Sequence, residues 1–321
     1  MKIKLDGFII ALCVSIAIGY FFPELYTAGE GIYFSWITTI GVSLIFFFYG
    51  LKLSFGQIKQ SLKNWKVHVL IQFATFVLFP LLVLPFYPLV QSDIQHSFWL
   101  SFLFLAALPS TVSSSVVMVS IARGNIPSAI FNASISGLIG IVITPLWMQF
   151  FLEFGELNVF KDVYWGLIRE IIIPVFLGMI LQKFYGSWAL RNSKNISLFD
   201  KVVILLIVYG SFAESFVSGV FNTVDANYLI LVLIGSIVLF FVIYGLLFLL
   251  VKYVFRFDIE DQITVLFCGS KKSLTHGSVF GKFLFVNSPN AGLLFLPLMI
   301  FHAFQILIVT IIAQRYHKRV D

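Results

Sequence analysis

The sequence SKKSLTHGS, residues 270–278, places two lysines and a histidine inside an otherwise apolar part of the chain. Its flanks read VLFC at 265–268 and FLFV at 283–286, which are compatible with lipid. A lysine at the centre of a bilayer costs roughly 2.5–3.5 kcal/mol, so Lys271 and Lys272 together would cost about 5–7 kcal/mol without partners. We therefore expect polar groups to surround both ammonium groups.

The composition is that of an integral membrane protein. Of 321 residues, 60% are hydrophobic and 11% are charged, whereas soluble domains contain about 25% charged residues. Apolar runs long enough to cross a hydrocarbon core predict an all-α polytopic fold with ten transmembrane helices, and residues 1–321 are expected to form a single transmembrane domain. The predicted spans are residues 6–22, 33–51, 67–90, 98–122, 126–151, 164–184, 202–221, 228–254, 260–286 and 291–314.

The distribution of basic residues predicts the orientation. The first span follows Lys2 and Lys4 and is expected to be a transmembrane helix, because no small-residue cleavage site of a signal peptide follows it. From a cytoplasmic N-terminus, most of the 21 Lys and Arg residues fall on the inner side, and Lys161, Arg169 and Lys282 fall on the outer side. This asymmetry predicts a multi-pass protein of the cell (inner) membrane with both termini in the cytoplasm, and no nucleic-acid partner.

The spans also predict an internal repeat. Ten spans divide into halves at about 1–155 and 156–321, which must enter the membrane in opposite orientations. The fourth span of each half is interrupted, by Pro109 in the first and by Gly269 and Gly277 in the second, and both breaks are rich in hydroxyl residues. Paired broken helices indicate a midplane binding site in a secondary transporter, although each serine taken alone also fits an ordinary helix-packing role.

Three further stretches carry a family resemblance. The turn ARGN at 122–125, after a span rich in Pro and Ser, resembles that of the bile acid:sodium symporter superfamily. The stretches FCGSKKSL at 267–274 and HVLIQFATFVLFP at 68–80 are more similar to the branch of bacterial uncharacterised permeases and a human orphan solute carrier than to the bile acid carriers proper. The resemblance covers the whole chain.

The resemblance implies a fold and a mechanism. Two inverted five-helix repeats, with two crossing broken helices, would form a fold shared with sodium-proton antiporters. Spans 1, 2, 6 and 7 would make a panel, and spans 3–5 and 8–10 would make a core. A substrate held between panel and core would reach each side of the membrane in turn.

The resemblance also implies positions for coupling-ion ligands. These positions are Gln72, Ser114, Ser115, Asn132 and Ser134. On the second broken helix the chain departs from the family, whose pattern there is Glu-x-Gly-x-Gln-Asn-Ser-Gly.

That departure removes two ligands. The acidic sodium ligand of the pattern is replaced by Phe267, and its glutamine is replaced by Lys271. We expect Lys271 to take the place of the sodium ion, with its three donors satisfied by Ser114, Ser115, Asn132 and unwound carbonyls. Because burial disfavours a charged ammonium, this lysine could also release and rebind a proton.

An anionic substrate is expected next to this cation, as in a superfamily of organic-anion carriers. The predicted substrate-binding residues are Ser113, Ser114, Lys272, Ser273, Thr275 and His276. Alternatively, both lysines snorkel to an interface. Near the outer end of the sixth span, Arg169 and Glu170 are expected to form an interfacial pair.

Other functions stay open. The chain could be a sodium-coupled symporter with its sodium sites retained, a non-transporting regulator or receptor on the same scaffold, or an intramembrane hydrolase with Ser-Lys or Ser-His chemistry. We expect a transporter of a small organic anion rather than an enzyme, without a resident cofactor. The sequence leaves the coupling ion, sodium or proton, and the oligomeric state undecided.

Overall fold

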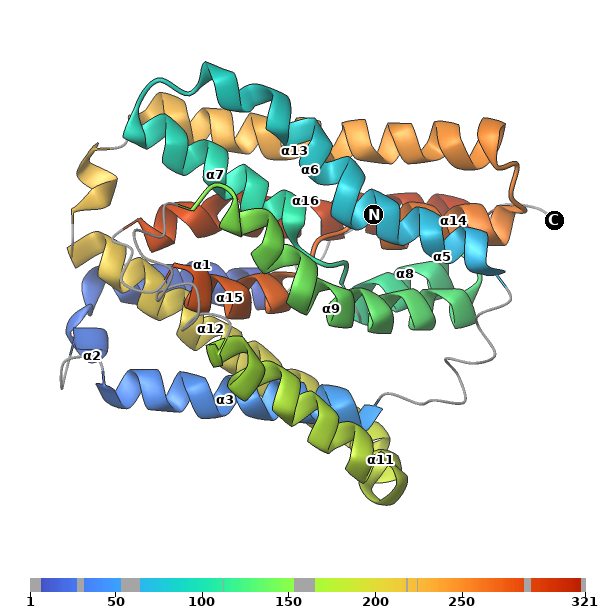
Figure 1. Cartoon of the computed structure of the whole chain (residues 1–321), viewed down its shortest axis with the longest axis horizontal. Helices are drawn as coiled ribbons and strands as arrows, with labels where there is room; N and C mark the ends of the chain where they lie inside the picture. The colour runs from blue at the N-terminus through green and yellow to red at the C-terminus, as the bar shows by residue number, and fades with distance from the viewer. Residues whose placement is uncertain are drawn as a thin grey trace. The chain divides into compact units, whose positions relative to one another are not determined.

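The computed structural model describes residues 7–27, 32–52, 64–111, 113–152, 165–217, 219–223, 225–285 and 290–318. Within these ranges every regular element is a helix and none is a strand (Figure 1). The all-helical prediction is confirmed.

Six helices in these ranges are long and apolar enough to cross a membrane, judged by length and composition. They are Phe34–Lys52, Trp65–Leu89, Ile126–Gln149, Ser193–Val217, Ala226–Val254 and Ala291–His317. All six coincide with predicted spans. The ten-span inverted repeat is not established by these helices and stays a prediction.

The four other predicted spans are helical but shorter or divided. The first is α1 (Gly7–Phe21), and the sixth joins a π-helical turn, η5 (Ile168–Ile172), to α11 (Ile173–Arg191). The fourth consists of α7 (Asp93–Ala107) and α8 (Ser113–Ile121), and the ninth consists of α14 (Ile259–Gly269) and α15 (Leu274–Leu284). The expected interruptions at Pro109 and after Gly269 are therefore present, and they explain why neither span counts as one long helix. Gly277 was expected to interrupt the ninth span as well, but it lies inside α15.

The chain divides into two compact units. Unit 1 comprises Met1–Ser54, Glu153–Asp225 and Ser278–Phe295. Unit 2 comprises Phe55–Leu152, Ala226–Gly277 and Leu296–Asp321.

In unit 1, α1 packs against α12 (Ser193–Val217) and α3 (Ile32–Lys52) packs against α11. The short helices α2 (Glu24–Thr27) and η6 (Val220–Thr223) also belong to this unit. Figure 1 shows α3 and α11 crossing. Their crossing requires glycine, because a Cβ on Gly50 or Gly178 would collide with the facing backbone.

In unit 2, the third span is irregular. It runs through α5 (Trp65–Phe73), the π-helical turn η3 (Ala74–Leu78), α6 (Phe79–Val83) and the 3-10 helix η4 (Leu84–Leu89). Besides α7, α8 and α14, this unit contains α9 (Ile126–Gln149), α13 (Ala226–Leu249), η7 (Leu250–Val254) and most of α16 (Ala291–His317). Helix α14 contacts α5, α8, α9 and α13, which places the second break among the elements that carry the first.

The ARGN turn fixes the start of α14. Asn125 donates from its side chain to the Asp261 carboxylate at 2.8 Å, and its backbone N–H donates to the Thr264 hydroxyl at 3.0 Å. Asn64 donates to the second Asp261 oxygen at 3.0 Å. The turn is thus a structural joint between the first broken span and the second.

Candidate functional site

The first break leaves helix-terminal carbonyls that need partners. Helix α7 ends at Ala107, so the last carbonyls of its backbone have no helical donors. The Ala107 carbonyl accepts from the Thr144 hydroxyl at 2.7 Å. The carbonyls of Ala106 and Leu108 accept from one ammonium group, that of Lys272, at 2.6 and 2.8 Å.

The second break is satisfied by hydroxyl groups. Helix α14 ends at Gly269, and the Leu266 carbonyl accepts from the Ser270 hydroxyl at 2.6 Å. The next two carbonyls, those of Phe267 and Cys268, accept from hydroxyls of the first break, Ser115 at 3.3 Å and Ser110. Hydroxyls of the first break therefore supply donors to the second, and Ser270 of the second break supplies one to its own helix.

A backbone bond joins the breaks directly. The Ser273 N–H donates to the Pro109 carbonyl at 2.9 Å. On the other side of the first break, the Ser110 N–H donates to the Ser136 hydroxyl at 3.0 Å. These bonds account for the polar groups that an interrupted helix exposes in an apolar interior.

Lys272 is fully buried and its ammonium is saturated. Besides the two α7 carbonyls, it donates to the Thr75 carbonyl at 2.7 Å. The ammonium also lies 4.0 Å from the centre of the Phe79 ring. The three short hydrogen bonds use all three donors of the ammonium group, and the cation–π contact adds to them.

The Thr75 carbonyl is free for this contact because of Pro80. In η3 the helix widens, so the Phe79 N–H donates to Ala74 instead of Thr75. The next donor in a π-helical register would be residue 80, which is proline and has no N–H. The neighbouring Phe76 carbonyl is freed as well and accepts from the Trp147 indole at 2.8 Å.

Gln305 holds the unwound backbone at Lys272. The Lys272 N–H donates to the Gln305 side-chain oxygen at 2.8 Å, and the Gln305 amide donates to the Lys272 carbonyl at 2.8 Å. The same amide nitrogen lies 3.0 Å from His302 Nδ1. One side chain of α16 thus replaces both backbone partners that Lys272 would have in a helix.

Lys271 has a different environment. Its side chain is buried, with a relative exposure of 1%, and its ammonium makes a single hydrogen bond within the described residues, to the Ser114 hydroxyl at 3.5 Å. Two of its three donors therefore have no protein partner there. The Ser114 hydroxyl also lies 2.9 Å from that of Thr111, which in turn lies 2.8 Å from that of Ser115.

Two of the remaining predicted ion ligands, Gln72 and Asn132, form a second cluster. The Gln72 amide donates to the Asn132 side-chain oxygen at 3.1 Å. The Asn132 amide lies 2.7 Å from His68 Nδ1 and donates to the Ser128 carbonyl at 2.9 Å. Asn132 is therefore bonded to neighbours in α5 and α9, and Ser134 is half-buried in α9.

The first turn of α15 carries the last predicted substrate residues. The Ser273 hydroxyl accepts from the His276 N–H at 3.3 Å and lies 2.9 Å from His276 Nδ1, so it caps this helix. Thr275 is half-buried in the same turn. Ser113 begins α8, and its side chain lies outside the described residues.

The coordination differs from the one expected in one respect. The unwound carbonyls were expected around Lys271, but they surround Lys272. Of the three side chains expected to contact Lys271, only Ser114 does so among the described residues. Neither lysine extends to a surface, so the snorkelling alternative is not observed. The sequence reasoning did not anticipate Thr75 and Pro80. Pro80 was the available signal, since a proline frees carbonyls one turn before it.

The breaks carry no carboxylate that could serve as a sodium ligand. No Asp or Glu occurs between residues 107 and 115 or between 266 and 276. Six carbonyls there accept from ammonium or hydroxyl donors, namely those of Ala106, Ala107, Leu108, Leu266, Phe267 and Cys268. The Gln72 side-chain oxygen is an exception, since it is buried and has no hydrogen-bond partner in the described part of the chain. One oxygen falls short of the several that a hard cation needs.

Comparison with known proteins identifies the family. The sequence model of the SBF-like CPA transporter family matches residues 6–318. The chain belongs to this family. Its members are transporters rather than enzymes, which confirms the expected class of protein.

Relatives within this family agree with the resemblance. An uncharacterised protein of Pseudomonas aeruginosa is 37% identical over 98% of the chain and 94% of its own length. YfeH of Escherichia coli, named as a candidate symporter, is 32% identical over 99% and 94%. Sodium/bile acid cotransporter 7-A of Xenopus laevis is 30% identical over 86% and 81%. The expected relation to the bile acid:sodium symporter superfamily is confirmed.

Proposed function

We propose that the protein is a secondary active transporter that carries a small organic anion across the cell membrane by alternating access. The observation that carries this proposal is the buried ammonium of Lys271, which has one long hydrogen bond at 3.5 Å. A buried cation with donors that are unused among the described residues favours an anionic ligand, because an unpaired charge in an apolar interior is costly. Membership of a transporter family supports the reaction class.

Lys272 then serves as a fixed cation. Its three carbonyl partners, at 2.6–2.8 Å, are ligands of the kind that a coupling cation takes when it leaves water. We assign to Lys272 the role of sodium substitute that the sequence suggested for Lys271. We assign to Lys271 the binding of the anionic substrate. On this proposal transport does not require sodium.

A sodium-coupled symporter is the second candidate. The unpartnered Gln72 oxygen favours it, as an acceptor that a cation would satisfy. The name of the Xenopus laevis relative also refers to sodium and bile acid, and that description applies to the relative.

A binding experiment separates these candidates. The full chain is purified in detergent, and its melting temperature is measured with acetate, succinate or taurocholate at constant ionic strength, in sodium and in potassium. We expect at least one anion to raise the melting temperature of the wild type in either cation, because a ligand of the folded state stabilises it. Lys271→Gln should abolish the response. Lys66→Gln, the same substitution at an exposed lysine of unit 2, should preserve it.

The outcomes are distinct. A rise that sodium produces and potassium does not would overturn the sodium-free proposal in favour of symport. An anion that binds is then tested for uptake into proteoliposomes. Binding without uptake would favour a non-transporting receptor, and an equal response of Lys271→Gln would remove Lys271 from the site.

A further inference from the structure

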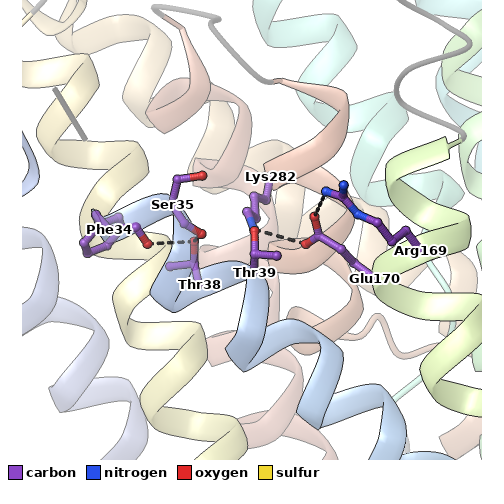
Figure 2. A network of polar contacts seen from close by, with 7 residues as sticks. All are labelled: Phe34, Ser35, Thr38, Thr39, Arg169, Glu170 and Lys282. Atoms are coloured by element: carbon purple, nitrogen blue, oxygen red, sulfur yellow. Dashed lines mark hydrogen bonds and ion pairs between the residues drawn. The ribbon is translucent and has the colours of Figure 1, made fainter. Parts of the chain in front are cut away.

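Unit 1 contains a buried carboxylate between two cations, shown in Figure 2. The sequence suggested that Arg169 and Glu170 form an interfacial pair. The two side chains do pair, at 3.3 Å, with Arg169 66% exposed and Glu170 only 6% exposed. Glu170 lies in η5, which packs against α3, and α15 supplies Lys282 as a partner that is distant in sequence.

Each oxygen of the Glu170 carboxylate contacts one cation. One Glu170 oxygen lies 3.3 Å from the Arg169 guanidinium, and the other lies 3.3 Å from the Lys282 ammonium. Lys282, 19% exposed, also donates to the Thr39 hydroxyl at 2.7 Å. Figure 2 shows Thr39 on α3, Glu170 on η5 and Lys282 on α15 converging on one point.

Local backbone features place these groups. Glu170 lies in a π-helical turn that precedes Pro174, whose missing N–H leaves a helical carbonyl unpaired and relaxes the α-helical register. Gly166 allows Phe283 to approach, since a Cβ there would lie 3.0 Å from the ring. The last turn of α15 is therefore held close to η5, and Lys282 reaches Glu170 from it.

The charges of this cluster do not cancel. Two cations face one carboxylate, which leaves a net charge of one positive unit. Lys282 uses two of its three donors within the described residues, for Glu170 and Thr39. Lys282 would keep Thr39 as a partner if the carboxylate moved away. The arrangement resembles an anion site in which the anion is a side chain of the protein.

We propose that Lys282, Thr39 and Arg169 form an anion-binding cradle, which Glu170 occupies in this structure and which the carboxylate of an organic anion occupies when Glu170 is displaced. The exposed Arg169 offers the first contact to an anion that arrives from solution. The ligand class is a small carboxylate. The physiological part of this inference rests on the proposed transport of organic anions, while the cradle itself is a property of the three side chains.

The test removes the carboxylate of Glu170 from the cradle. Glu170→Gln leaves two cations without a counter-charge, so the cradle should take up a carboxylate from solution. The probe is acetate, titrated at constant ionic strength into the detergent-purified full chain while the melting temperature is recorded. At ten times its dissociation constant, a single site shifts the folding equilibrium by roughly tenfold. We expect a saturable rise for Glu170→Gln beyond any rise that acetate produces in the wild type.

Matched variants locate the site. Glu24→Gln, the same substitution at an exposed position of unit 1, should behave as the wild type. The double variant Glu170→Gln/Lys282→Met should lose the rise. If Glu170→Gln does not fold, Glu170→Asp shortens the occupant by one methylene and should give an intermediate response. An absent rise in a folded Glu170 variant, or an equal rise in the double variant, would overturn the cradle.

The same titration in a Lys271→Gln background separates the two proposals. Binding at the cradle must survive this change, whereas binding at Lys271 must not. Loss of the acetate response in that background would therefore overturn the cradle. Its persistence would support the cradle even if no anion were found to be transported.

Discussion

Two regions of the molecule surround a lysine with polar partners, fully buried in one and partly exposed in the other, and they satisfy it in opposite ways. In unit 2 the Lys272 ammonium meets three neutral backbone carbonyls, and in unit 1 the Lys282 ammonium meets the Glu170 carboxylate and one hydroxyl. Backbone carbonyls at a helix break cannot leave the ammonium without local unfolding, whereas a glutamate can change its rotamer. Lys272 therefore behaves as a permanent part of the fold, and Lys282 has an exchangeable partner.

The largest loss of stability should follow from removing the ammonium group of Lys272. Lys272→Met leaves the carbonyls of Thr75, Ala106 and Leu108 without their donor. Each unsatisfied buried carbonyl costs about 1–3 kcal/mol, so we expect a loss of roughly 4 kcal/mol in the free energy of unfolding. Unfolding in mixed detergent micelles measures this loss. A Lys272→Met protein as stable as the wild type would show that the carbonyls do not depend on the ammonium.

Breaking the pair of Lys282 and Glu170 should cause a smaller loss in the free energy of unfolding, and a second substitution should restore part of it. Lys282→Met leaves Glu170 buried with only the exposed Arg169, and we expect a loss of about 2–3 kcal/mol, less than for a fully buried pair because Lys282 is partly exposed. Adding Glu170→Gln removes the orphaned charge and should restore at least half of that loss. The same unfolding assay, run as a double-mutant cycle, measures the coupling between the two side chains. Additive losses would mean that Lys282 and Glu170 do not interact.

Much of the fold was readable from the sequence. Apolar runs located helices, and Pro109 and Gly269 located both interruptions, because proline and glycine change the backbone locally. Hydroxyl residues at the breaks indicated that freed carbonyls needed donors. Span lengths alone could not establish how many helices cross the membrane.

The pairing of side chains was less predictable. The choice between Lys271 and Lys272 as the coordinated cation depends on the direction of an unwound backbone, to which helical geometry does not apply. Gln305, the side chain that fixes this direction, is 33 residues away from Lys272. The burial of Glu170 likewise depends on Lys282, which lies 112 residues away in the chain.

The smallest effect on stability is expected at Lys271, and this makes it the most informative of the three lysines. Its one long bond to Ser114 contributes little, and replacing a buried charge by an apolar side chain of similar volume is often neutral. Lys271→Met should therefore change the free energy of unfolding by less than about 1 kcal/mol while removing the anion-induced rise in melting temperature. Both quantities come from the same purified sample. A loss as large as that of Lys272→Met would mean that Lys271 is a second structural cation. The unused donors of Lys271 would then not be available to a substrate.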